Sequence, residues 1–238
     1  MDDVNGDQKL TISTINEYSV LDFLSEITSF TEKTGAFIMF TNQLTHEPAF
    51  LQTPDYTPVL SPSNAEDSPY SNSAHYHANM AAFILLGKWF NYLRQNGVYD
   101  NTRIIIVSDH GWNADENFPY NIELPNGDSL ETYNALLMMK DFNISGNIKT
   151  DHAFMTDADV PFLALDSVVE HPVNPFTHKS LETDKSGKVF ITSSSNLHPT
   201  SHFKYSFKIN REEWLSVQND IFNIANWRKE TVNNENSN

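Results

Sequence analysis

Four consecutive β-branched residues at positions 104–107 constrain the fold of this chain more than any other stretch of its sequence. A run of Ile and Val this long is typical of a strand that is covered on both faces, as the strands of parallel sheets are. The run follows a predicted helix over residues 74–95, where apolar residues recur at helical spacing until Asn96-Gly97 ends the helix. With another buried strand before that helix, the three elements would form a parallel crossover, so we expect an α/β fold.

The apolar run at residues 36–42 predicts that earlier strand, and predicts it to be buried. Thr14 and Glu17 have the spacing of a capping box and begin a predicted helix that Gly35 ends. After the strand, residues 52–73 carry four prolines among Ser, Asn and Asp and predict a long irregular loop. Loops of this kind often border active sites.

The second half of the sequence gives shorter patterns. Residues 133–139 predict a strand, and residues 160–165 predict a helix with Pro161 in its first turn. Residues 188–192 and 203–208 predict a hairpin-type pair of strands, the second with apolar and polar residues alternating. The final residues, 233–238, are expected to form a disordered tail.

Charge and composition exclude several classes of function. Lys and Arg number 15 against 31 Asp and Glu, and the net charge of −16 disfavours binding to nucleic acid or to anionic lipid. The absence of cysteine removes disulfides, thiolate metal ligands and cysteine nucleophiles. No apolar stretch approaches the length of about 18 residues that a membrane span requires, and the first six residues lack the pattern of a secretion signal, so the chain as written is expected to be soluble.

Asp109-His110-Gly111 follows the strongest predicted strand directly. Open α/β sheets bind ligands beyond the carboxyl ends of their strands. Neighbouring side chains of a regular strand point in opposite directions, so Asp109 and His110 converge only where the strand ends and bends, which Gly111 permits. A carboxylate with an imidazole suits zinc or manganese better than calcium or magnesium. The alternative is that Asp109 caps a turn and His110 is a surface histidine.

Several blocks of sequence, in order along the chain, carry a resemblance to a known family. The block at 39–48 reads Met-Phe-Thr-Asn-Gln-Leu-Thr-His-Glu-Pro, and the block at 97–111 contains the strand and Asp-His-Gly. The blocks at 134–140 and 158–165 follow. Together they resemble the later half of the sulfatase-like branch of the alkaline phosphatase superfamily, which includes lipoteichoic acid synthases and phosphoethanolamine transferases.

The resemblance implies roles for three residues. Asp109 and His110 match the family's paired ligands for a divalent metal, with zinc or manganese the expected ion. His46 matches the catalytic histidine that contacts the transferred anion or its leaving group. The implied reaction is attack of a hydroxyl on a sulfate or phosphate ester, followed by resolution of the covalent ester by water or by an acceptor. Hydrolysis and transfer, and sulfated or phosphorylated glycans, polymers and lipids, are all compatible with these residues.

The resemblance also implies a fold and a context. It implies a three-layer α/β/α sandwich with a mostly parallel central sheet and a small C-terminal antiparallel sheet. In the family, the nucleophile and the first acidic metal ligand lie upstream of the block that matches 39–48, and only about 35 residues precede that block here, too few for the missing βαβ units. We therefore expect residues 1–232 to be the C-terminal part of a sulfatase-like catalytic domain and to be inactive alone. The parent protein is expected to be extracytoplasmic and tethered to a membrane through a region upstream of this chain.

Two other functions stay open from the sequence. The chain can be a non-catalytic binding or scaffold module that retains the fold, or one half of an obligate complex whose partner supplies the missing strands. A chain that lacks central strands would expose an unpaired sheet edge, which favours self-association. Among the remaining candidates, His75 and His77 are expected to pack at the start of the 74–95 helix rather than bind metal, because residues two apart do not share a helix face. His152 and Asp157 lie on a loop that could approach the site, although helix capping explains that stretch equally well.

Overall fold

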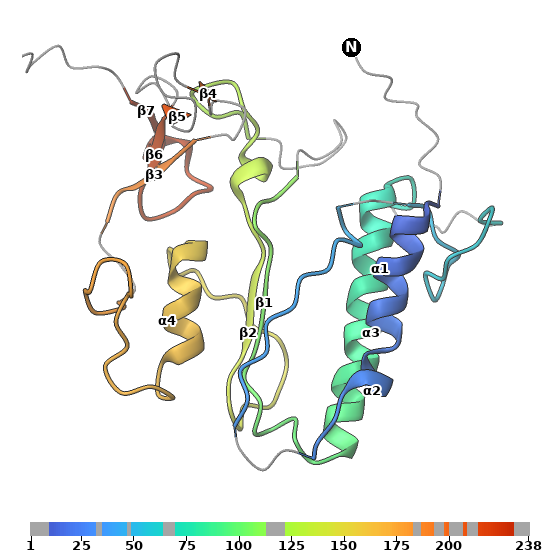
Figure 1. Cartoon of the computed structure of the whole chain (residues 1–238). Helices are drawn as coiled ribbons and strands as arrows, with labels where there is room; N and C mark the ends of the chain where they lie inside the picture. Colours follow the sequence, from blue (N-terminus) through green and yellow to red (C-terminus); the bar gives the residue numbers. More distant parts are fainter. Residues whose placement is uncertain are drawn as a thin grey trace, which may run out of the picture. The chain divides into compact units, whose positions relative to one another are not determined.

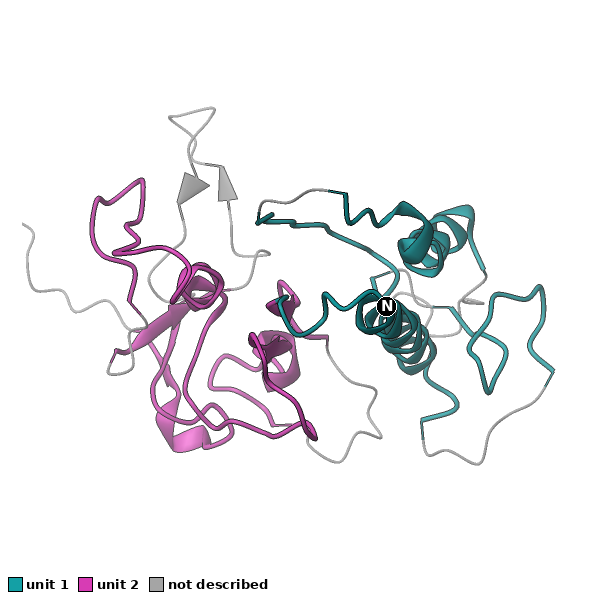
Figure 2. Ribbon diagram, turned by 90° about the horizontal axis from the view of Figure 1, so that it is seen from below, with its two compact units in different colours: residues 1–102 teal, residues 103–238 magenta. Residues whose placement is uncertain are grey.

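The protein has mixed α and β structure and divides into two compact units, Met1–Thr102 and Arg103–Asn238 (Figure 2). The computed structural model describes residues 10–31, 35–46, 49–63, 70–112, 122–182, 187–192, 198–199, 207–208 and 214–230. The tail expected at 233–238 lies outside these ranges. Among the described residues, no helix has both the length and the apolar character needed to cross a membrane.

Unit 1 is built on helices α1 (Ile12–Asp22), α2 (Leu24–Ile27) and α3 (Ala74–Gln95), with α1 and α3 side by side (Figure 1). The helix predicted to begin at Thr14 begins two residues earlier, because the side chain of Thr11 caps it by accepting a hydrogen bond from the Thr14 amide. It also ends early, since the chain turns at Phe23 before the short α2.

Helix α3 has the bounds that the sequence predicts. The hydroxyl of Ser73 accepts a hydrogen bond from the Tyr76 amide at its start, and Gly97 follows its end with a φ of 69°. Its buried face packs against the core of unit 1. That core contains Tyr18, Leu21, Leu24, Leu44, Leu51, Tyr56, Ala81 and Leu85. Burial of each leucine contributes about 1.5–3 kcal/mol, so this cluster fixes α3 against α1 and against the loop at 49–57.

The prediction of a buried strand at residues 36–42 is wrong. Residues 35–43 form no regular secondary structure, and the side chains of Phe37, Ile38 and Met39 are 75%, 80% and 83% exposed. The sequence pattern identified an apolar run correctly, but a strand also requires hydrogen-bonding neighbours, which residues 36–41 lack among the described residues.

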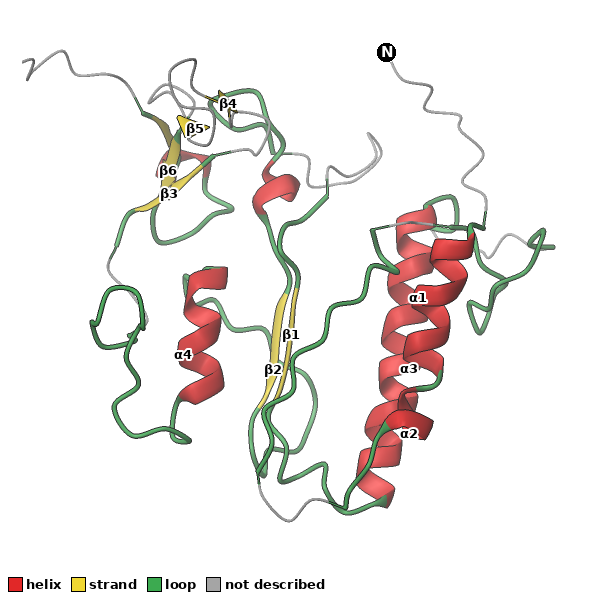
Figure 3. Cartoon of the chain, in the orientation of Figure 1, coloured by secondary structure: helices red, strands yellow, loops and turns green. Residues whose placement is uncertain are grey.

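Unit 2 contains the strand predicted from the β-branched run, β1 (Ile104–Val107), which pairs antiparallel with β2 (Leu137–Lys140). The strand expected over 133–139 is therefore confirmed only in its second half, because Leu130–Tyr133 forms a 3₁₀ turn, η1, ahead of β2. Helix α4 (Val160–Leu165) has the predicted bounds with Pro161 in its first turn, and η2 (Asp157–Asp159) precedes it. Figure 3 shows these helices and strands coloured by type.

A small antiparallel sheet forms near the C-terminus, as predicted. Its strands are β3 (Val189–Ile191), β6 (Leu215–Val217) and β7 (Arg228–Lys229), in the order β3-β6-β7, with η5 (Ile224–Asn226) before β7. The pairing predicted for β3 is wrong. Its partner is β6, whereas β5 (Phe207–Lys208) pairs with β4 (His198–Pro199). A hydrophobic core beneath this sheet explains the difference, since it includes Leu215 and Val217 of β6 together with Trp227.

Candidate metal centre at the end of β1

Arg103 anchors the beginning of β1. Its guanidinium donates to Asp141 Oδ1 at 2.9 Å, after the end of β2, and to the carbonyl oxygens of Leu163 and Asp166 at 2.9 and 2.6 Å, at the end of α4. The side chain is only 6% exposed. Carbonyls at the end of a helix have no partner within the helix, so this one cation satisfies them and joins α4 to the β1–β2 pair. The sequence predicts no role for Arg103 beyond a place in the strand.

Asp141 completes the anchor as an ionised carboxylate. The amide of Phe142 donates to its carboxylate at 2.7 Å and holds its pKa below the usual range, and the hydrogen bond and charge of Arg103 lower that pKa further. The ring of Phe142 also lies 4.8 Å below the guanidinium carbon of Arg103. Hydrogen bonds, an ion pair and a cation–π contact therefore fix the start of β1 in position.

The other end of β1 is fixed by close backbone packing. Ser108 bonds to Leu136 twice, through its amide at 3.0 Å and through its hydroxyl at 2.8 Å. The Gly111 amide then donates to the Thr132 carbonyl oxygen at 3.1 Å. A Cβ atom at Gly111 would lie 1.9 Å from the Glu131 carbonyl oxygen, so only glycine fits this close approach to η1. Asp109 and His110 thus occupy a short loop whose two ends are tied down.

The side chains of Asp109 and His110 converge, as the sequence predicts. Asp109 Oδ2 lies 3.9 Å from His110 Nε2, and Asp109 Oδ1 accepts a hydrogen bond from the His110 amide at 3.1 Å. His110 Nδ1 lies 2.5 Å from the Gly111 carbonyl oxygen. A carbonyl oxygen can only accept, so Nδ1 carries the proton in this contact.

This arrangement leaves a lone pair on His110 Nε2 in the neutral ring, facing the carboxylate oxygen of Asp109. Two acceptor atoms that face each other repel unless a proton or a metal cation lies between them. The separation of 3.9 Å is shorter than two metal–ligand bonds of about 2.1 Å placed end to end, so one ion can contact both atoms. Metal-binding histidines commonly donate their other ring N–H to a backbone carbonyl, as His110 does to Gly111.

Asp157, on η2, lies near enough to Asp109 for the charge of Asp109 to affect the pKa of Asp157. Partial burial raises the pKa of the Asp157 carboxyl, and the negative charge of Asp109 raises it further. Helix capping also explains this stretch. Asp159 Oδ2 accepts a hydrogen bond from the Thr156 amide at 2.8 Å, as in a capping box. His152 is exposed.

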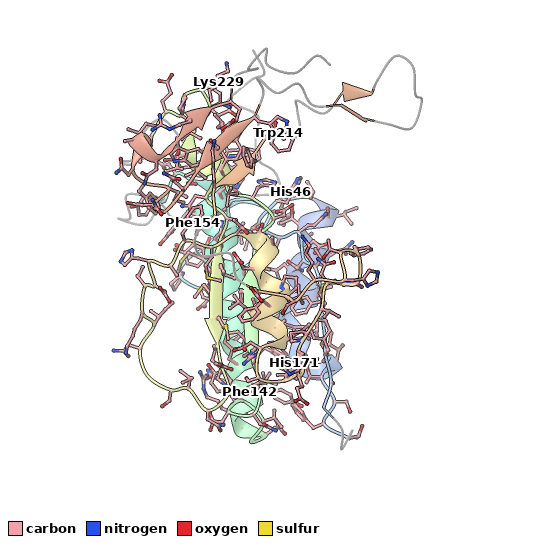
Figure 4. The ribbon with its side chains drawn as sticks, turned by 90° about the vertical axis from the view of Figure 1, so that its left-hand side faces the viewer. His46, Phe142, Phe154, His171, Trp214 and Lys229 are labelled. Carbon is pink, nitrogen blue, oxygen red and sulfur yellow. The ribbon has the colours of Figure 1, made fainter. Side chains whose placement is uncertain are left out.

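His46, the predicted catalytic residue, lies in unit 1 at the end of a turn and is exposed (labelled in Figure 4). Its amide donates to the Gln43 carbonyl oxygen at 3.0 Å. The turn is held on α1, since Glu17 accepts hydrogen bonds from the Asn42 side chain and from the Gln43 amide, both at 2.9 Å. His46 is thus presented from an anchored turn within its own unit.

His77 confirms the packing role expected for the histidines at the start of α3. It is 5% exposed, Nδ1 accepts from the Leu51 amide at 3.1 Å, and Nε2 donates to the Ser71 carbonyl oxygen at 2.9 Å. Both ring nitrogens are therefore occupied, which leaves neither of them available as a metal ligand.

Asp109 and His110 are the two residues of this centre that could hold a metal together. Across the ranges that the structure describes, no group of three or more His, Cys, Asp or Glu side chains could hold an ion. Comparisons of the chain with protein-family models, with curated proteins and with solved structures found no match.

Proposed function

We propose that this chain is the C-terminal part of the catalytic domain of a metal-dependent hydrolase or transferase that acts on sulfate or phosphate esters. The observation that supports this proposal most is the convergence of Asp109 Oδ2 and His110 Nε2, which lie 3.9 Å apart at the end of β1. The sequence blocks at 39–48, 97–111, 134–140 and 158–165 agree with it through their resemblance to the sulfatase-like branch of the alkaline phosphatase superfamily. In this proposal the complete domain is a three-layer α/β/α sandwich with a mostly parallel central sheet.

Asp109 and His110 would hold zinc or manganese. The bound ion would supply positive charge that neutralises an ester oxygen and activates a hydroxyl nucleophile. Asp109 contributes the negative charge that attracts the cation, and the hydrogen bond from His110 Nδ1 to Gly111 makes Nε2 the ligand atom of the neutral ring. His46 would donate a hydrogen bond or a proton to the departing oxygen.

The proposal extends to substrate and location. The substrate would be a sulfated or phosphorylated glycan, polymer or lipid, and a region upstream of this chain would supply the nucleophile and the membrane tether. The parent protein would act outside the cytoplasm, and this chain alone would be inactive. The alternatives are a non-catalytic binding module and one half of an obligate complex with a second chain.

The test is the metal content of the full chain after dialysis against zinc or manganese, measured by elemental analysis. A matched control exists in unit 2, where Glu170 Oε1 and His171 Nε2 lie 4.0 Å apart and both side chains are 93% exposed, without a strand end or a tight glycine beside them. We expect Asp109→Ala to reduce the apparent affinity for metal at least tenfold and Glu170→Ala to leave it unchanged. Equal metal content in wild type and Asp109→Ala would contradict the proposal.

A further inference from the structure

A cavity of about 150 Å³ lies in unit 2, where residues of η2 and of β3 meet. All of its lining residues belong to unit 2, so this unit alone forms the walls. Three of them are apolar and three are polar: Phe154, Ala158, Val189, Thr156, Asp159 and Glu182. A cavity of this volume accepts a group of about six non-hydrogen atoms, so it would hold one small substituent rather than a whole cofactor.

Asp159 is the most deeply buried polar residue of the lining, with 9% of its surface exposed. Its Oδ2 accepts hydrogen bonds from the amide and the hydroxyl of Thr156, at 2.8 and 3.3 Å. Its Oδ1 has no hydrogen bond in the part of the chain that the structure describes. A buried carboxylate oxygen without a partner is costly, so Oδ1 is available to a donor that enters the cavity.

Glu182 gives the cavity a second acidic side chain, which is exposed. Within the described ranges, neither carboxylate forms an ion pair with a Lys, Arg or His side chain. The described lining thus carries two acidic groups and no basic one, in a chain whose net charge is −16. A cavity of this kind attracts a cation, with Glu182 at its exposed side and Asp159 at its buried side.

The rest of the lining favours an organic cation over a metal ion. Half of the lining residues are hydrocarbon, and no three His, Cys, Asp or Glu side chains of the described residues could hold a metal. Phe154, labelled in Figure 4, and Val189 also pack against the core beneath the C-terminal sheet, which fixes this apolar wall. An aromatic ring attracts an ammonium group, and the apolar wall covers the carbons that carry it. A primary ammonium also brings three N–H donors for the carboxylate and hydroxyl oxygens of the lining.

We propose that this cavity binds a primary ammonium group on a short alkyl chain, with Asp159 Oδ1 as the principal acceptor. The two hydrogen bonds from Thr156 position the carboxylate in advance, so binding requires no rearrangement of that side chain. A ligand gains at most about 1.5 kcal/mol for each non-hydrogen atom, so a simple amine of about three such atoms should bind with a dissociation constant near the millimolar range.

Titration of the full chain with ethylammonium chloride tests the proposal. The backbone amide signals of Thr156 and Val189 in a nitrogen–proton NMR spectrum report on the two sides of the cavity. Sodium chloride at the same ionic strength controls for screening of the charged surface, and ethanol is a neutral ligand of the same size. We expect ethylammonium to shift both signals with saturation in the millimolar range, and we expect ethanol to bind more weakly.

Two variants and one matched control identify the acceptors. Asp159→Asn keeps an oxygen that can accept from the Thr156 amide but removes the charge, and should raise the dissociation constant for ethylammonium about tenfold. Asp151→Asn is the control, because Asp151 is exposed, accepts from the Ala153 amide at 2.9 Å and does not line the cavity. Glu182→Gln changes an exposed side chain, so it tests the site even if Asp159→Asn does not fold, and should weaken binding about two- to fivefold.

Equal affinities in the wild type and in the Asp159→Asn and Glu182→Gln variants would overturn the proposal. So would ethanol that binds as tightly as ethylammonium, or calcium that displaces ethylammonium at a lower concentration, since the cavity would then be an apolar site or a metal site. The titrations need no metal at Asp109 and His110, so this inference stands or fails separately from the proposed function.

Discussion

Gly111 approaches Glu131 so closely that a methyl group on its α-carbon would lie 1.9 Å from the Glu131 carbonyl oxygen. The Gly111 amide bonds to Thr132 in the same turn. This contact between the loop after β1 and η1 makes Asp109 and His110 leave the strand together. The convergence of the two side chains thus depends on a residue that has no side chain.

Gly111→Ala is therefore expected to displace this loop. Overpacking of this kind costs about 1–3 kcal/mol of unfolding free energy, and the metal affinity of the Asp109–His110 pair should fall with it. Urea denaturation and metal titration measure the two effects. Gly87→Ala is the control, because a Cβ at Gly87 in α3 meets no atom within 4 Å and the change should stabilise the helix by about 0.5–1 kcal/mol. Wild-type stability and metal affinity in Gly111→Ala would show that the close contact does not constrain the site.

Arg103→Lys keeps the charge at the start of β1 and removes the planar fork of donors. A lysine cannot donate to Asp141 and to the carbonyl groups of Leu163 and Asp166 together, so hydrogen bonds of a nearly buried cation are lost at a cost of about 1–3 kcal/mol. Denaturation followed by circular dichroism would measure this loss. The same change at Arg94, which is exposed and lies 3.9 Å over the Tyr99 ring, should cost less than about 1 kcal/mol. Comparable losses at the two positions would contradict the role of Arg103 as an anchor.

The contrast between these elements shows what the sequence could predict. Helix α3 was predicted to the residue because its apolar residues recur at helical spacing and Asn96-Gly97 ends it, and both are local signals. The convergence of Asp109 and His110 was predicted because Gly111 follows them directly. Arg103 was missed because its partners lie 38 to 64 residues further along the chain. The strand expected at 36–42 was wrong for the same reason, since hydrogen-bonding neighbours are a property of the fold and not of the apolar run.

Stability should fall in alkaline solution through Tyr133. Burial, followed by the hydrogen bond to Asp128 at 2.5 Å and the charge of that residue, raises the pKa of Tyr133 to about 12 from an ordinary value of 10.0. The folded state then keeps a proton that the unfolded state releases, so this contribution is complete below pH 10 and is lost as pH rises toward about 12. Urea unfolding at intervals from pH 9 to 11.5 measures the loss.

Tyr133→Phe supplies the control for this alkaline effect. The variant has no phenol to ionise at this position, so its stability should decline less steeply over the same interval. Tyr18, whose pKa is raised chiefly by burial, is present in both proteins, and its effect cancels in the comparison. Parallel declines in the two proteins would exclude Tyr133 as the source.

His77→Phe tests whether the buried histidine of α3 has a packing role alone. Phenylalanine fills the space but leaves the Leu51 amide and the Ser71 carbonyl oxygen without partners, at a cost of about 2–4 kcal/mol for the two groups. His77→Asn should recover part of this loss, because its side-chain oxygen can replace Nδ1 as the acceptor for the Leu51 amide. The metal content of both variants should equal that of the wild type, since both ring nitrogens of His77 are engaged by the backbone. A variant that folds normally but loses metal would instead make His77 a ligand and would require a different site from the one at the end of β1.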